Sequence, residues 1–160
     1  MSAGQTHLIA NYIASMANNS PANKWASDSI KCALITSSTT PAITDSNPTW
    51  GAAGAQNYST NEVAAGGLYT AGGFTLTGNT VTGGGTATIS LNTTSPISWA
   101  ANASNPTTAR WAIFYDNTTA NKEVLGFMDL GAVTSLVTGL QININGAASG
   151  VVPLFQGTAV

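Results

Sequence analysis

Charge is scarce in this sequence of 160 residues, which has four lysine and arginine residues and six aspartate and glutamate residues. The formal net charge is −2, so no basic surface is available to neutralise a run of phosphates. We therefore expect no direct binding to nucleic acid. Because so few charges also leave weak electrostatic repulsion between copies, the composition favours self-association ahead of acid–base chemistry.

Cysteine and histidine are equally scarce, since Cys32 and His7 are the single residues of their kinds. One cysteine cannot form an intrachain disulfide, which excludes a small module held together by disulfides, and we expect Cys32 to fill core space. A zinc site is also excluded, because it needs more cysteine and histidine ligands than these two residues. A Ser-His-Asp triad would need His7, which lies in a predicted helix among residues with a simpler packing role.

Carboxylates in a catalytic pattern are also lacking. Asp116, Glu123 and Asp129 share one short segment and would be the candidates for a glycosidase pair or for a calcium site. Asp116 precedes Asn-Thr-Thr and is typical of a turn, Glu123 adjoins Lys122 in the same loop, and Asp129 ends a predicted strand. No nucleophile, base and orienting group come together, so we expect neither an enzyme nor a cofactor.

Long apolar runs are absent, and no stretch is long enough to cross a bilayer. The N-terminus also lacks the basic and then apolar layout of a signal peptide. We therefore expect a protein that is synthesised in a cytoplasm and has no membrane anchor.

The sequence does contain enough apolar residues, 43%, to build one core without disulfides or metals. In residues 6–17 the apolar side chains follow a helical spacing, which predicts a short amphipathic helix within an N-terminal segment of residues 1–20. This face either packs against the chain's own core or contacts a neighbouring subunit. Its residues are Leu8, Ile9, Tyr12, Ile13 and Met16.

From residue 21 the apolar period changes to that of strands, with glycine, asparagine and proline turns between them. We predict an all-β domain over residues 21–160, an antiparallel β-sandwich or jelly-roll-like barrel of about eight strands. Residues 37–67 form a long irregular excursion in which partner contacts are expected. The predicted strands cover residues 29–36, 72–77, 79–82, 86–91, 97–99, 109–115, 124–130, 140–145 and 151–155.

Aromatic residues supply the candidate contact points. Trp99 and Trp111 fall in strand patterns and are expected in the core. Trp25, Trp50 and Tyr58 fall in irregular segments, where an exposed aromatic side chain serves as an anchor for a neighbouring subunit or for a glycan.

Four blocks of sequence resemble a known family. They are DSIKCALIT at residues 28–36, YTAGGFTL at 69–76, TARWAIFYD at 108–116 and GFMDLG at 126–131. Their order and spacing are similar to those of small structural proteins encoded among the head and tail genes of tailed bacteriophages.

This resemblance implies a virion component without enzymatic activity, a head decoration or cement protein with a β-sandwich-like fold. It would be made in the cytoplasm of the bacterial host and would lie on the capsid surface. Its partners would be further copies of itself, as a homotrimer, and the major capsid protein. The alternative function is a receptor- or glycan-binding module of a head fibre or tail, acting through Trp25, Trp50 or Tyr58.

Overall fold

The structure is a computed structural model that describes residues 6–17, 24–51, 56–82 and 90–144. Within these ranges most of the regular elements are strands, and they are accompanied by the α-helix α1 (Ala10–Ala17) and the 3₁₀-helix η1 (Tyr58–Asn61). The strands are β1 (Thr6–Leu8), β2 (Ile30–Ile35), β3 (Pro48–Thr49), β4 (Gln56–Asn57), β5 (Phe74–Thr75), β6 (Thr80–Thr82), β7 (Ser90–Asn92), β8 (Ile97–Trp99), β9 (Ala109–Asp116), β10 (Val124–Thr134) and β11 (Leu140–Ile142).

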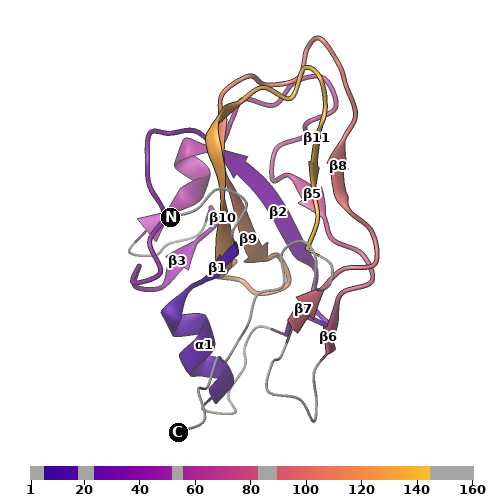
Figure 1. The fold of residues 1–160 in the computed structure, drawn as a ribbon. Helices are drawn as coiled ribbons and strands as arrows, with labels where there is room; N and C mark the ends of the chain where they lie inside the picture. The colour runs from indigo at the N-terminus through magenta and orange to yellow at the C-terminus, as the bar shows by residue number, and fades with distance from the viewer. Residues whose placement is uncertain (1–5, 18–23, 52–55, 83–89, 145–160) are drawn as a thin grey trace, which may run out of the picture.

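The main sheet has five strands in the order β1-β10-β9-β2-β5, and every neighbouring pair is antiparallel (Figure 1). In the central strand β9, every side chain except the half-buried Arg110 is buried. Because successive side chains of a strand point to opposite faces, this pattern means that both faces of the sheet are covered around β9. Cys32 of β2 pairs with Phe114 of β9 and is fully buried, as expected from the sequence.

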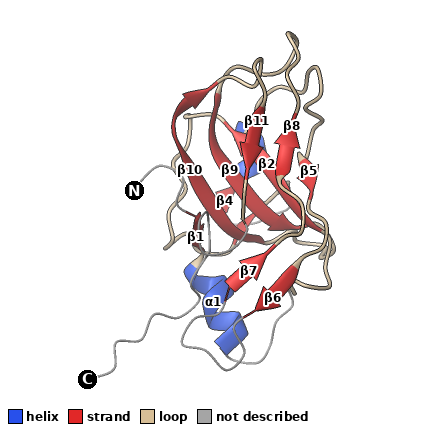
Figure 2. Cartoon of the chain, turned by 45° about the vertical axis from the view of Figure 1, so that its right-hand side comes forward, coloured by secondary structure: helices blue, strands red, loops and turns tan. Residues whose placement is uncertain are grey.

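The pair β8 and β11 lies beside the β2–β5 side of the sheet (Figures 1 and 2). Trp99 of β8 contacts the rings of Tyr69 and Phe74, with centroid distances of 5.7 and 6.0 Å. The alternation of exposed and buried side chains predicted for residues 140–145 continues through Asn143 and Ile144, but the strand itself ends at Ile142. The all-β class is confirmed, and the described strands do not close into a barrel.

The N-terminal segment differs from its prediction. Residues 6–8 form the edge strand β1 instead of the first turn of a helix, and they pair with residues 126–128 of β10. A Cβ atom at Gly126 would lie 2.5 Å from the carbonyl oxygen of His7, so the glycine permits this close approach. Helix α1 starts only after Ile9, whose backbone N–H donates to the carbonyl of Leu125 at 2.9 Å.

The excursion of residues 37–67 contains the short parallel pair β3–β4 and the helix η1, and it packs against the sheet. Val63 N–H donates to the carbonyl of Leu34 in β2 at 3.0 Å. The strand predicted at residues 151–155 lies outside the described residues, as do the end of the N-terminal segment at residue 20 and most of residues 86–91. No helix in the described ranges is long and apolar enough to cross a membrane.

The burial of β9 predicts the cost of a cavity at its centre. Ile113 is fully buried and pairs with Ala33 and Phe127 on the two neighbouring strands. Ile113→Ala is expected to lower the free energy of unfolding by about 3 kcal/mol, measured by urea denaturation. Val133→Ala at a 55% exposed position is the control and should change it by less than about 0.5 kcal/mol; equal effects would contradict the assigned core.

Candidate functional site

The three aromatic residues expected as exposed anchors are buried, so the expectation of exposure is wrong. Trp25 and Trp50 are each 4% exposed, and Tyr58 is fully buried. Trp50 stacks on Tyr115 of β9 with a centroid distance of 5.0 Å, and the Tyr58 hydroxyl donates to the Asp45 carboxylate. The irregular segments that carry these side chains fold back onto the sheet, because its faces need an apolar cover.

The apolar residues of the N-terminal segment also point into the chain's own core. Leu8, Ile9 and Tyr12 are buried, and Ile13 packs against the same core from a half-buried position. Met16 lies in α1, and its side chain is outside the described part of the structure. The described part of this face is therefore occupied within one chain.

A recess of about 190 Å³ lies between α1, the residues before β3 and the start of β10. Across it, the side-chain amide of Asn11 donates to Oδ1 of Asn47 at 2.9 Å. Ser15 Oγ donates to the carbonyl oxygen of Tyr12 at 2.8 Å. The recess is lined by Ile9, Asn11, Tyr12, Ser15, Asn47, Pro48, Glu123 and Val124.

Backbone contacts fix the walls of this recess. Ala10 N–H donates to the carbonyl of Ile43, and Trp50 N–H donates to the carbonyl of Lys122, both at 2.9 Å. In the described ranges, Asn47 and Lys122 are the non-glycine residues with positive φ, each at 48°. Such left-handed residues persist where the surroundings hold them, and they cluster at binding sites and tight turns.

Two carboxyl groups meet close to Tyr12, one of the residues that line the recess. Burial, and then hydrogen bonding and repulsion from Asp28, raise the pKa of the Asp116 carboxyl above its usual value. Burial, together with the negative charges of Asp116 and Asp28, raises the pKa of Tyr12 to about 12. Asp116 Oδ1 also accepts from Thr118 N–H at 2.7 Å, which confirms the turn that the sequence predicts here.

All six aspartate and glutamate side chains accept hydrogen bonds from other groups of the chain. Most of these bonds fix turns and loops: Asp45 accepts from Ala42 N–H, and Glu62 accepts from Gly72 N–H. The Glu123 carboxylate accepts from the Thr119 hydroxyl. The carboxylates therefore serve the local structure.

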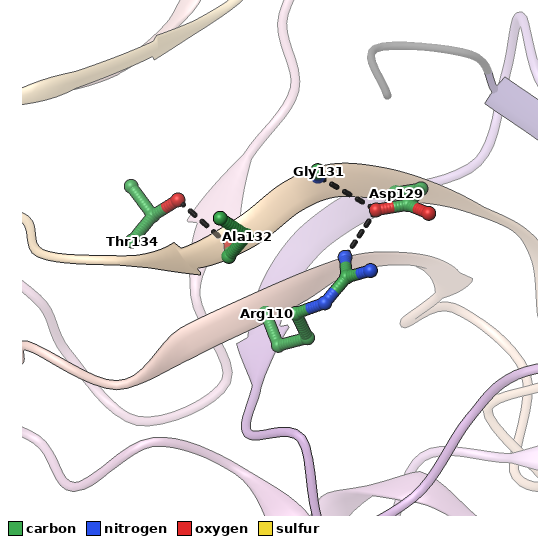
Figure 3. Close-up of polar contacts among 5 residues, drawn as sticks. All are labelled: Arg110, Asp129, Gly131, Ala132 and Thr134. Atoms are coloured by element: carbon green, nitrogen blue, oxygen red, sulfur yellow. Dashed lines mark hydrogen bonds and ion pairs between the residues drawn. The ribbon is translucent and has the colours of Figure 1, made fainter. Parts of the chain in front are cut away.

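Asp129 forms an ion pair with Arg110 of the neighbouring strand β9 (Figure 3). The prediction that Asp129 ends a strand is wrong, because β10 continues to Thr134 through an irregularity after Asp129. Asp129 Oδ1 accepts from Gly131 N–H at 2.6 Å, and Gly131 has a φ of 85°. The hydrogen bond from Arg110 lowers the pKa of Asp129, and the guanidinium lies 4.2 Å from the ring centroid of Trp111.

No group of three or more histidine, cysteine, aspartate or glutamate residues that could hold a metal ion occurs among the residues that the structure describes. Comparison with protein-family models, with curated proteins and with solved structures finds no match. Sequence reasoning missed the recess, because its walls come from three segments far apart in the chain. Two of its lining residues stand at positions that indicate a turn or a loop in the sequence: Asn47 precedes a proline, and Glu123 lies in a predicted loop.

The buried carboxyl of Asp116 predicts a pH dependence of stability. Its raised pKa in the folded chain means that the stabilisation present at low pH is lost as the pH rises through that folded-state value. Asp116→Asn keeps an acceptor for Thr118 N–H and removes the charge. The variant is expected to unfold at higher denaturant than the wild type at pH 7, with the difference shrinking toward about pH 4. Equal pH dependence of the denaturation midpoint in the two proteins would contradict this prediction.

The Arg110–Asp129 pair predicts the opposite pH dependence. Asp129→Asn is expected to lower the free energy of unfolding by about 2 kcal/mol at pH 7, because the half-buried Arg110 side chain loses its charged acceptor. The lowered pKa of Asp129 means that this stabilisation is present above the unfolded-state pKa and is lost as the pH falls through the folded-state value. Denaturant titrations of the wild type and the variant at pH 7 and at about pH 3 measure this difference in the free energy of unfolding. A difference that is the same at both pH values would contradict the stabilising ion pair.

Proposed function

We propose that this chain is a capsid decoration protein of a tailed bacteriophage. It forms homotrimers on the outside of the icosahedral head and bridges neighbouring major capsid subunits. The observation that supports this function best is where the four blocks of the phage-family resemblance lie in the sheet. They carry β2, β5, β9 and part of β10, which are four neighbouring strands in the order β10-β9-β2-β5.

The position of these blocks gives the resemblance a physical meaning. The blocks are separated along the chain, yet their backbones are hydrogen-bonded to one another in a single sheet. A resemblance confined to one hairpin would indicate only a local turn pattern. A resemblance spread over adjacent strands of the core indicates a shared fold, and we propose that the β8–β11 pair is part of the second layer of a β-sandwich.

The charges support a function that acts through surfaces. Charged residues make up only 6% of the sequence, and Arg110 and Asp129 pair with each other, so few charges remain for contacts with a partner. Docking then rests on shape, apolar contact and hydrogen bonds. A closed trimer multiplies each modest contact on the capsid, because the second and third contacts form at high effective concentration.

The alternative function, a receptor- or glycan-binding module, depended on exposed Trp25, Trp50 or Tyr58. Their burial removes the surface platform on which that function would rest.

The decoration function predicts both a location and a response to salt. An image reconstruction of particles made from the genome that encodes this chain is expected to show its density on the outer surface of the head. Washing those particles at about 1 M salt should leave the density in place, because screening acts chiefly on exposed charge pairs. Density confined to the interior, a protein absent from mature particles, or release at moderate ionic strength would contradict the function.

A further inference from the structure

The recess beside α1 is smaller than most ligand pockets and is the size of a site for a single ring. Its volume of about 190 Å³ exceeds that of an engineered cavity of about 150 Å³ that accepts benzene, so a six-membered ring with substituents fits. Ile9, Pro48 and Val124 supply an apolar part of its lining, and Tyr12 contributes an aromatic ring. Polar groups from α1 and from Asn47 lie around this apolar part, which is the usual composition of a ligand pocket.

The polar groups include both donors and acceptors. The hydrogen bond between Asn11 and Asn47 leaves the oxygen of Asn11 as an acceptor and the side-chain N–H groups of Asn47 as donors. Ser15 donates its hydroxyl hydrogen to Tyr12, so its oxygen keeps lone pairs for a ligand. Lysine and arginine side chains only donate and would leave the Asn47 amide without an acceptor, whereas a hydroxyl group both donates and accepts.

The charges around the recess disfavour anions. Glu123 lines it, and its carboxylate would repel a carboxylate or phosphate ligand. A neutral ligand with several hydroxyl groups satisfies the donors and the acceptors together.

The recess is also held in place before any ligand arrives. Asn47 is fixed in a left-handed conformation, after a turn in which Asp45 accepts from Ala42 N–H at 2.9 Å. The opposite wall is tied to it by the bond from Trp50 N–H to the carbonyl of Lys122. Binding to a preformed site avoids the cost of ordering loops.

We propose that this recess binds one pyranose ring of a neutral sugar, with its hydroxyl groups on Asn11, Ser15 and Asn47. This site lies beyond the decoration function and does not depend on it. It also uses none of the aromatic residues on which the sequence-based glycan hypothesis relied.

The test is a ¹H–¹⁵N NMR titration of the whole chain with the methyl glycosides of glucose, mannose, galactose and N-acetylglucosamine. At least one is expected to give saturable shifts of the Asn11 and Asn47 side-chain amides, with a Kd of about 1 mM for a ligand of this size. Asn47→Gly, which suits the positive φ, and Asn11→Ala, on the exposed side of α1, should each weaken binding about tenfold.

Asn117→Gly is the matched control, because it makes the same change at an exposed turn that does not line the recess. It should bind as the wild type does. The proposal is overturned if no glycoside gives saturable shifts at a hundredfold excess over about 1 mM, which would make the recess a hydrated hollow only. It is also overturned if Asn47→Gly and Asn117→Gly bind equally well, or if methylguanidinium saturates the site and the sugars do not.

Discussion

The burial of β9 on both faces is the constraint on which the rest of the structure depends. A strand in the middle of a sheet satisfies its backbone through its neighbours, but its apolar side chains must be covered from two sides. In this chain long irregular segments provide part of that cover. This explains why Trp50 lies on Tyr115, and why Ile9 and Tyr12 face the core instead of a partner.

A second consequence concerns the few charged groups. Irregular segments that cover a sheet need their turns fixed, and the carboxylates of this chain do so by accepting backbone and hydroxyl hydrogens. Asp45 supports the turn before Asn47, and Asp129 holds the irregular part of β10 against Arg110. Because charged residues make up only 6% of the chain and its formal net charge is −2, its surface has few charges. Such a surface suits assembly with copies and capsid subunits, and recognition of neutral ligands.

The sequence predicts the strands that carry continuous apolar runs, because their pattern is local. The strands predicted at residues 29–36 and 109–115 correspond to β2 and β9, and the turn at Asp116 forms as its side chain and the following residues indicate. Periodicity could not reveal that residues 6–8 pair with β10, because that pairing depends on an open edge formed more than a hundred residues later. It also could not show that β10 continues past Asp129, since the ion pair to Arg110 is a contact between strands.

The aromatic residues illustrate the same limit. The absence of a regular pattern suggests a surface segment, but burial depends on what the segment packs against and not on its regularity. The recess joins α1, Asn47 and Glu123, which only the folded chain brings together. The parts predicted well are therefore local in origin, and the candidate site is a product of long-range packing.

The central proposal is that this chain adheres to a capsid through a surface with few charges. The most direct measurement adds the purified chain to phage heads that lack it and counts the copies bound per head as its concentration rises. The account predicts saturable binding in multiples of three copies on the outside of the head, together with a higher temperature of head opening. Heads that bind no copies, and that open at the same temperature with and without the chain, would contradict it.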